Sequence, residues 1–196
     1  MNFVYYQLGG YHMTKQVSVF LADGFEEIEG LTVVDLLRRA GITVTTVSIT
    51  GASLIHGAHG IDVQADKLFE EMNYENQDML VLPGGMPGTL NLGKHNGLEQ
   101  LLKEFDKQEK YIAAICAAPS VFGQYGFLKG KKATSYPGFE EQLEGATYMT
   151  EAVVVSEHII TSRGMGTAID FSLALIEQLI DKEKAEAIGK SIIYYA

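Results

Sequence analysis

The sequence predicts an α/β fold in which helices cover both faces of a mostly parallel sheet. Short apolar runs rich in β-branched residues recur along the chain, and segments with apolar residues at helical spacing lie between them. Strands that alternate with helices form βαβ units, whose crossover helices cover a parallel sheet on both sides. No repeat, linker or low-complexity tract interrupts this alternation.

Six short segments have the length and composition of strands. They are Gln16–Ala22, Ile42–Ile49, Ile61–Gln64, Asp78–Leu82, Tyr111–Ile115 and a short strand that begins at Ala133-Thr134. Nearer the C-terminus, Ala152–Val155 and Ile159–Thr161 predict a hairpin that turns at Glu157-His158.

Helices are predicted where apolar residues recur every three or four positions. They cover Glu26–Ala40, Gly97–Asp106, Ala117–Tyr125, Gly166–Ile180 and Lys182–Ile193. In the first helix, this spacing predicts an inward face made of Ile28, Leu31, Val34, Leu37 and Ala40. Gly41 follows in the usual position of a C-terminal cap.

Composition limits the size and the partners of the protein. Its 196 residues suit one domain with a sizeable core, which we expect over residues 14–196. Lys+Arg total 15 against Asp+Glu 25, a formal net charge of −10, so nucleic acid is not expected as a bulk partner. No apolar run approaches the roughly 20 residues of a membrane span. The single cysteine, Cys116, cannot form an internal disulfide, and the expected location is the reducing cytoplasm.

Residues 1–13 are predicted to be a leader or a non-native start. They lack the basic and continuous apolar regions of a signal peptide. Met13 precedes the first predicted strand closely, and we interpret it as the natural start. A real extension whose tyrosine and phenylalanine side chains pack on the domain is the alternative.

Unusual residues follow three of the predicted strands, in Asp23–Glu29, Pro83–Gly88 and Cys116–Pro119. Ligands of open α/β sheets bind outside the carboxyl ends of the strands. We therefore expect these three segments to converge there and to form the functional site.

Cys116 lies where the apolar strand Tyr111–Ile115 turns directly into a helix. A nucleophile elbow has this arrangement, in which a sharp turn exposes the side chain. Because a helix N-terminus stabilises a thiolate, we expect the thiol pKa to lie below its free value of about 8.5. A buried, inert core thiol is the alternative.

The other two segments carry groups that suit a nucleophile. Backbone N–H groups around Gly84-Gly85, together with that of Ala117, would stabilise an oxyanion, and phosphate binding is a rival use of the loop. Compensation of the helix dipole explains Glu26 and Glu27. Glu29 lies at the edge of the apolar face, where desolvation would raise its pKa and suit it to general acid–base work.

Five stretches occur together in a specific order: ADGFEEIEG (Ala22–Gly30), LLRRAGITVT (Leu36–Thr45), VLPGGMPG (Val81–Gly88), AAICAAPSV (Ala113–Val121) and TSRGMGTAIDFSLALIEQL (Thr161–Leu179). In this order they resemble the ThiJ/PfpI superfamily, and specifically its DJ-one/YajL-like branch. The resemblance covers nearly all of Val17–Asp181.

The resemblance implies a flavodoxin-like three-layer αβα sandwich of the class I glutamine amidotransferase-like type, usually a homodimer. It implies Cys116 as the nucleophile, Glu29 as its buried general acid and base, and Gly85 and Ala117 as oxyanion amides. Members of the family are described as glyoxalases that convert methylglyoxal to lactate without glutathione, as deglycases, as chaperones and as oxidation sensors. The implied chemistry needs no metal or organic cofactor.

Three further residues are candidates for substrate binding. Tyr136 precedes Pro137, where many members of the branch have a histidine; it either orients a substrate or simply packs. His59 matches loosely a basic residue that borders the cleft of relatives. Arg163 matches the family pattern and would bind an anion, with a surface salt bridge as the alternative. His56 and His59 have metal-like spacing but no neighbouring ligands, so no metal site is expected.

The leading hypothesis is a Cys116-dependent glyoxalase or deglycase that protects against carbonyl and oxidative stress. Its substrate would be methylglyoxal, another small aldehyde or an early glycation adduct; without the family's histidines, a protease is not expected. The alternative is a non-enzymatic redox sensor or chaperone in which Cys116 is oxidised to sulfinate. A flavin or nucleotide binder is a third hypothesis, for which Pro83–Gly88 is the only candidate phosphate loop.

Overall fold

A seven-stranded sheet forms the centre of the computed structural model, which describes residues 14–194. The strand order is β10–β11–β7–β6–β1–β2–β5, and every neighbouring pair is parallel except the β10–β11 hairpin. The strands are β1 (Gln16–Leu21), β2 (Thr43–Ser48), β5 (Lys67–Leu68), β6 (Met79–Leu82), β7 (Tyr111–Ile115), β10 (Val153–Ser156) and β11 (Ile159–Ser162). The expected leader or non-native start at residues 1–13 lies outside the described residues.

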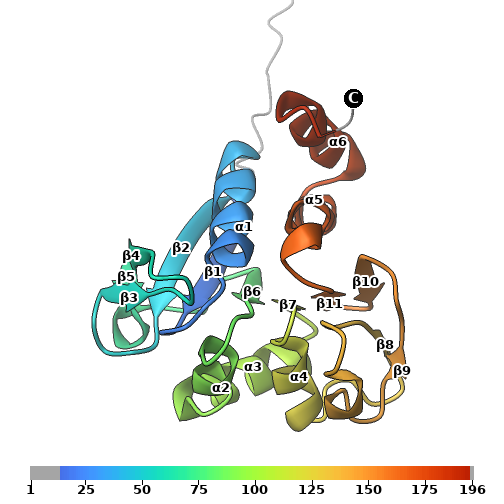
Figure 1. The fold of residues 1–196 in the computed structure, drawn as a ribbon. Coiled ribbons are helices and arrows are strands. Elements are labelled where there is room, and N and C mark those ends of the chain that lie inside the picture. Colours follow the sequence, from blue (N-terminus) through green and yellow to red (C-terminus); the bar gives the residue numbers. More distant parts are fainter. Residues whose placement is uncertain (1–13, 195–196) are drawn as a thin grey trace, which may run out of the picture.

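Helices cover both faces of this sheet. They are α1 (Glu27–Arg39), α2 (Gly88–Leu92), α3 (Asn96–Lys107), α4 (Pro119–Gln124), α5 (Ala168–Leu179) and α6 (Lys182–Ser191). Figure 1 shows α1, α5 and α6 on one face and α2, α3 and α4 on the other. This confirms the predicted αβα sandwich. Within residues 14–194, no helix has both the length and the hydrophobicity that crossing a membrane requires.

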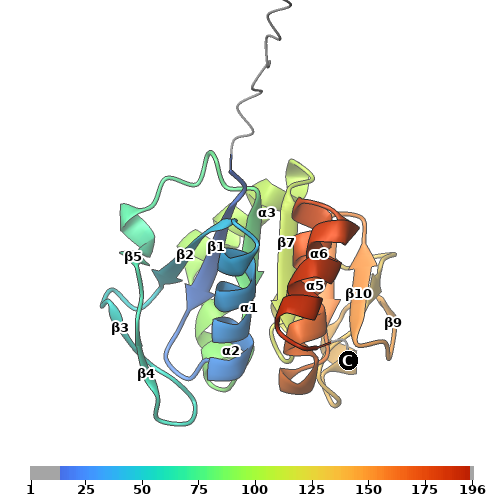
Figure 2. The same cartoon turned by 90° about the horizontal axis from the view of Figure 1, so that it is seen from above.

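Several short elements complete the fold. They are β3 (Leu54–His56), β4 (Asp62–Gln64), β8 (Lys132–Ala133), β9 (Thr147–Tyr148) and the 3₁₀ turns η1 (Phe69–Glu71), η2 (Glu140–Gln142) and η3 (Met165–Thr167). The β3–β4 hairpin lies at the side of the molecule beyond β2 (Figure 2). Sequence patterns do not predict four of the short elements, β3, β5, β9 and α2. Such segments are too short to show a periodic pattern of apolar residues.

Two apolar layers hold the sandwich together. Along β1, Val17, Val19 and Leu21 belong to the core beneath α1 and α5, whereas Phe20 belongs to the core on the α3 and α4 side. All four side chains are fully buried. Burial on both faces accounts for the continuous apolar run of this strand.

The predicted inward face of α1 is wrong at its first turn. Ile28 and Leu31 are 49% and 37% exposed, whereas Glu27 and Glu29 are 3% and 1% exposed. The helix is oriented so that these two carboxylates meet hydrogen-bond donors from the loops at the strand ends. Further along, Val34 and Leu37 are buried as predicted.

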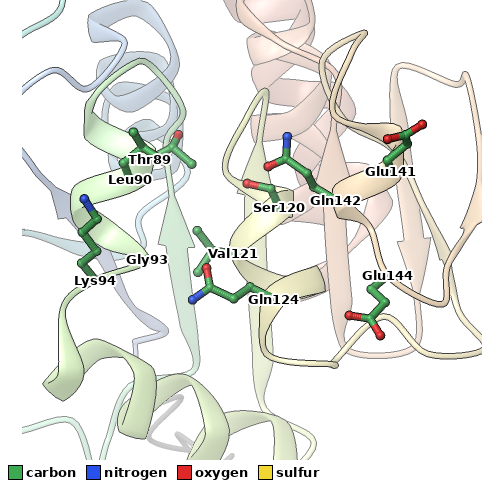
Figure 3. Close-up of a pocket in the computed structure, with 10 residues that line it drawn as sticks. All are labelled: Thr89, Leu90, Gly93, Lys94, Ser120, Val121, Gln124, Glu141, Gln142 and Glu144. Carbon is green, nitrogen blue, oxygen red and sulfur yellow. The ribbon is translucent and has the colours of Figure 1, made fainter.

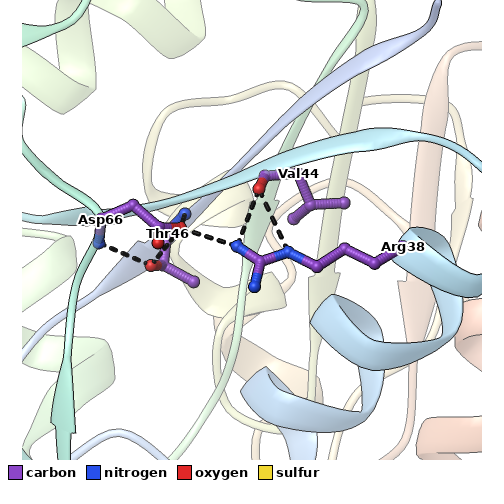
Figure 4. A network of polar contacts seen from close by, with 4 residues as sticks. All are labelled: Arg38, Val44, Thr46 and Asp66. Atoms are coloured by element: carbon purple, nitrogen blue, oxygen red, sulfur yellow. Dashed lines mark hydrogen bonds and ion pairs between the residues drawn. The ribbon is translucent and has the colours of Figure 1, made fainter.

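A polar clasp ties the end of α1 to the sheet (Figure 4). Arg38 donates from Nε and Nη2 to the Val44 carbonyl oxygen, and its Nη2 lies 2.7 Å from Asp66 Oδ2. The same Asp66 oxygen accepts hydrogen bonds from the backbone N–H and the hydroxyl of Thr46. Burial opposes the ionisation of Asp66, but the Thr46 donors and the Arg38 charge hold its pKa below the usual range.

The strand order places the functional segments side by side. From β1, the chain adds β2 on one side and β6, β7 and β11 on the other, so the order reverses between β1 and β6. Ligand sites of open α/β sheets lie at such a switch point, outside the carboxyl ends of the strands. The segments that follow β1, β6 and β7 meet there.

Candidate active site

Cys116 lies in a sharp turn between β7 and α4. Its φ is 65°, in the left-handed region that non-glycine residues rarely adopt. Two hydrogen bonds hold the turn: the Cys116 N–H donates to Ser162 O at 3.0 Å, and the Tyr136 N–H donates to Cys116 O at 2.8 Å. The thiol is partly exposed. This is the geometry expected of a nucleophile elbow.

Glu29, in the first turn of α1, lies beside the thiol. Its Oε2 accepts the backbone N–H of Gly84 at 2.9 Å, and its carboxyl group is hydrogen bonded to the Cys116 side chain. A Cβ on Gly84 would lie 2.6 Å from Cys116 Cβ and 2.7 Å from Glu29 Oε2. Glycine is therefore required here for the carboxyl group and the thiol to meet.

The protonation of this pair follows from its burial. Burial raises the pKa of Glu29 to about 7, although hydrogen bonds from Cys116 and Gly84 favour the carboxylate. Burial, and then the charge of Glu29, raises the pKa of Cys116 to about 12. Two groups that share a hydrogen bond titrate as a pair. Above neutrality, a neutral thiol faces a carboxylate that can take its proton.

The expected lowering of the Cys116 pKa is therefore wrong for this structure. The helix α4 has only six residues and begins at Pro119, three positions after the cysteine. Its dipole is outweighed by the burial of the sulfur and by the adjacent Glu29. A thiol in this state needs a neighbouring base to become a nucleophile, as in serine–histidine pairs, and Glu29 is the carboxyl group beside it.

Two backbone amides surround the sulfur. Hydrogen bonds from the backbone of Ala117 and Gly85 favour the thiolate and partly oppose the rise in the Cys116 pKa. Gly85 has a φ of +90°, and a Cβ there would lie 2.3 Å from the backbone nitrogen of Glu26. The structure thus places both predicted oxyanion amides beside the reactive atom, where charge would develop on a bound carbonyl.

Tyr136 lies beside Cys116 at the protein surface. Its side chain is 51% exposed, and its ring lies 3.2 Å from the position that a Cβ on Gly164 would take. That same position is 3.9 Å from Cys116 Sγ. Tyr136 is therefore close to the sulfur and open to solvent, which suits contact with a substrate.

Arg163 and His59 make contacts elsewhere. The Arg163 guanidinium donates to the Thr150 carbonyl oxygen at 3.0 Å, and no ion pair of Arg163 occurs among residues 14–194. His59 donates its backbone N–H to Glu27 Oε1 at 2.7 Å, and its Nδ1 lies 2.9 Å from Glu27 Oε2. In the described part of the chain, no hydrogen bond or ion pair joins either side chain to Cys116.

Glu27 has a structural role that the sequence analysis missed. Besides His59, its Oε1 accepts the N–H of Ile61, so one buried carboxylate holds the loop between β3 and β4 on α1. Burial opposes its ionisation, but these hydrogen bonds lower its pKa to about 2. Compensation of the helix dipole is therefore an incomplete explanation. A Cβ on Gly57 would lie 2.2 Å from Glu27 Oε1, so glycine is required there for the loop to approach the carboxylate. No local sequence pattern reveals this contact between distant residues.

One group of potential metal ligands occurs among the described residues. Glu26, Glu27 and His59 bring one ligand atom each within 4.8 Å of one another. Both Glu27 oxygens already accept hydrogen bonds from His59. His56 does not join the group, because its Nδ1 pairs with Asp62 Oδ1 at 2.7 Å. The two imidazole rings therefore have different carboxylate partners, and His56 is not part of the group of potential metal ligands around His59.

The fold and the site together define an α/β sandwich protein with a cysteine at a strand-to-helix turn, hydrogen bonded to a buried glutamate. The chain belongs to the DJ-1/PfpI family, whose model matches residues 15–178.

Known proteins similar to this chain span several kingdoms. "Protein DJ-1 homolog B" of Arabidopsis thaliana is 40% identical over 92% of the chain, which spans only 42% of that relative. "Glutathione-independent glyoxalase DJ-1" of Schizosaccharomyces pombe is 33% identical and is covered over 97% of its length. The structure "Toxoplasma gondii DJ-1, oxidized" superposes with a TM-score of 0.90 at 38% identity, over 93% of this chain and 100% of that one.

Proposed function

We propose that this chain is a cysteine-dependent glyoxalase that converts methylglyoxal to lactate without glutathione. The observation that carries the proposal is the hydrogen bond between the Cys116 thiol and the buried Glu29 carboxyl group. A base with a pKa of about 7 beside a nucleophile is matched to proton transfer at neutral pH. The name of the Schizosaccharomyces pombe relative supports the same activity.

In the first step, Glu29 accepts the thiol proton while Cys116 Sγ attacks the aldehyde carbon. The carbon–oxygen π bond breaks, and the developing oxyanion accepts hydrogen bonds from the Gly85 and Ala117 amides. Glu29 then gives the thiol proton to that oxygen, which yields a hemithioacetal and restores the Glu29 carboxylate for the next step. Because the proton leaves as the bond forms, the high pKa of the Cys116 thiol does not prevent attack.

In the second step, Glu29 removes the proton from the former aldehyde carbon, and an enediol forms. Return of the proton to the neighbouring carbon gives a thioester of lactate. The aldehyde carbon is oxidised and the ketone carbon is reduced, so no external oxidant is needed. Water then hydrolyses the thioester, which releases lactate and restores the thiol. In an early glycation adduct of methylglyoxal, the former aldehyde carbon bears the amine; as the C–N bond breaks and the protonated amine leaves, the thiol adds to the same carbon, so deglycation would use the same residues.

The proposal is tested by measuring lactate formation from methylglyoxal in a buffer without glutathione or amines. We expect turnover by the wild-type chain and none above background by Cys116→Ala, with an unchanged melting temperature. Exposed Ser191→Ala serves as a control variant and should keep full activity. Turnover retained by Cys116→Ala would refute the assignment.

A redox sensor is the second candidate. The Toxoplasma gondii structure is described as oxidized, which supports oxidation chemistry in the family. Two equivalents of peroxide would convert the Cys116 thiol to a sulfinic acid and release two waters, and protonated Glu29 would donate to a sulfinate oxygen. With one cysteine in the chain, no internal disulfide can intercept the intermediate. A stable gain of two oxygen atoms at Cys116, without methylglyoxal turnover, would favour this candidate.

We also propose that the protein acts as a homodimer. Exposed apolar side chains of Ile28, Leu31 and Ile61 line a groove of about 590 Å³ with Ile169 and Ile192. Thr32, Asp35 and Arg39 also line the groove. Exposed apolar side chains gathered in one groove favour association, and a second copy is the occupant that the family resemblance suggests. The single cysteine suits a reducing compartment such as the cytoplasm.

A further inference from the structure

A second cavity lies outside the cysteine site. It is a groove of about 550 Å³ between α2, α4 and the segment around η2 (Figure 3). This volume lies within the range of small-ligand sites, about 300–1,000 Å³. Neither Cys116, Glu29 nor Tyr136 lines it.

Opposite charges lie at the two ends of this groove. Figure 3 shows Lys94 beside α2 on one side and Glu141 and Glu144 on the other. Among residues 14–194, none of these three side chains has a hydrogen-bond or ion-pair partner. A cation at one end and carboxylates at the other complement a ligand that is negative at one end and positive at the other.

Neutral polar groups line the groove between its charged ends. The side-chain amides of Gln124 and Gln142 and the hydroxyl of Ser120 point into this region (Figure 3). An amide side chain offers both donors and an acceptor, which matches the N–H and C=O of a peptide bond. The Ser120 hydroxyl donates to the Ala117 carbonyl oxygen at 2.7 Å, which leaves its oxygen free to accept.

Thr89 supplies an independent observation. It lines the groove from α2, is 2% exposed, and its Oγ1 has no hydrogen-bond partner among the described residues. Buried polar atoms are nearly always paired in native proteins. Its backbone N–H donates to the Gly85 carbonyl oxygen at 2.9 Å. The walls of the groove are therefore hydrogen bonded to Gly85 and Ala117, the residues whose amides surround the sulfur.

We propose that this groove binds a dipeptide in its zwitterionic form. The ligand carboxylate lies toward Lys94, its ammonium group toward Glu141 and Glu144, and its peptide bond between Gln124 and Gln142. The inference goes beyond the proposed function, because binding at this site requires no turnover at Cys116.

The test is a titration of the full chain with dialanine, in which the NMR chemical shifts of the backbone amides are measured at each ligand concentration. We expect saturable shifts at Thr89, Ser120 and Gln142. N-acetyl-dialanine and dialanine amide, which each lack one charge, should bind about fivefold more weakly, the effect of roughly 1 kcal/mol at an exposed charge pair. Lys94→Met should weaken dialanine binding by a similar factor, whereas Lys107→Met, a matched change on α3, should not.

Three results would overturn the proposal: no shift at the groove residues, equal affinity for dialanine and its blocked analogues, or equal affinity of Lys94→Met and wild type. A thermal unfolding curve for each variant shows that it is folded. Cys116→Ala should bind dialanine like the wild type, so failure of the glyoxalase assignment and failure of this inference are distinguishable.

Discussion

The backbone N–H of Gly84 donates a 2.9 Å hydrogen bond to Glu29 Oε2, across 55 positions of sequence. The Gly84 Cα lies so close to the pair that even one methyl group would contact both Glu29 Oε2 and Cys116 Cβ, at 2.7 and 2.6 Å. The loop after β6 therefore sets the distance between the Glu29 carboxyl group and the Cys116 thiol.

Gly84→Ala should separate Glu29 from Cys116 and strongly reduce methylglyoxal turnover. Overpacking at a buried position costs about 1–3 kcal/mol, so the free energy of unfolding should fall by that amount. Gly166→Ala is the matched control, because nothing lies within 4 Å of its added Cβ. Denaturant unfolding and lactate assays measure both effects. Equal activity of the two variants would contradict the proposed geometry.

Glu29→Gln should change the pH dependence of stability. The folded pKa of about 7 lies above the ordinary value of 4.5, because burial favours the neutral carboxyl group. Glu29 therefore stabilises the fold most below about pH 4.5, and this contribution is lost as pH rises through about 7. Glutamine cannot ionise, so the variant does not lose this contribution. The melting temperature of the variant minus that of the wild type should therefore increase from about pH 5 to about pH 8. Parallel profiles would contradict the raised pKa. Turnover should fall by roughly 10²-fold or more.

Asp66→Asn should loosen the clasp between α1, β2 and β5. The carboxylate accepts two hydrogen bonds from Thr46 and pairs with Arg38, so we expect a loss of about 1–2 kcal/mol. The folded pKa is lowered, so this stability is present above the unfolded pKa and is lost as pH falls through the folded value. Asp35→Asn, which breaks only an exposed pair with Arg39, should lower the unfolding midpoint less than Asp66→Asn. Indistinguishable unfolding midpoints for Asp66→Asn and Asp35→Asn would show that the clasp does not stabilise the fold.

Glu27→Gln should release the loop between β3 and β4. Loss of a buried carboxylate that holds His59 and Ile61 should cost about 1–3 kcal/mol. Since its pKa is lowered to about 2, the contribution is present above about pH 4.5 and disappears as pH falls toward 2. Hydrogen exchange at the His59 and Ile61 amides should accelerate. Glu26→Gln is the control: Glu26 also lies near the His59 ring, 3.5 Å from Nδ1, but the His59 and Ile61 amides donate to Glu27. Similar exchange rates in both variants would show that Glu27 does not hold the loop.

Ile28→Lys should dissociate the proposed homodimer. A charge placed in the apolar groove would be buried by the second copy, which should weaken association by at least about tenfold. Sedimentation velocity over a range of concentrations measures the change. Val155→Lys, at an equally exposed apolar position on β10, should leave the oligomeric state unchanged. A wild-type chain that stays monomeric would reject the dimer itself.

Local patterns in the sequence predict the regular elements well. The strand Tyr111–Ile115 has the predicted bounds, and the hairpin of β10 and β11 turns where expected. The pattern fails at Ile28 and Leu31, since periodicity identifies an apolar stripe without showing what packs against it. It also fails for Glu27, whose partner His59 lies 32 positions away.

Residue order alone was enough to indicate the αβα class, the family, and the convergence of Glu29, Gly84 and Cys116, because strand and helix signals are local and strand ends share one edge. Only the tertiary structure decided whether the pKa of Cys116 is raised or lowered. Burial and a carboxylate 87 positions earlier in the chain outweigh the short helix that follows Cys116. The groove between Lys94 and Glu141 likewise exists only after folding, since charges act through space and not along the chain.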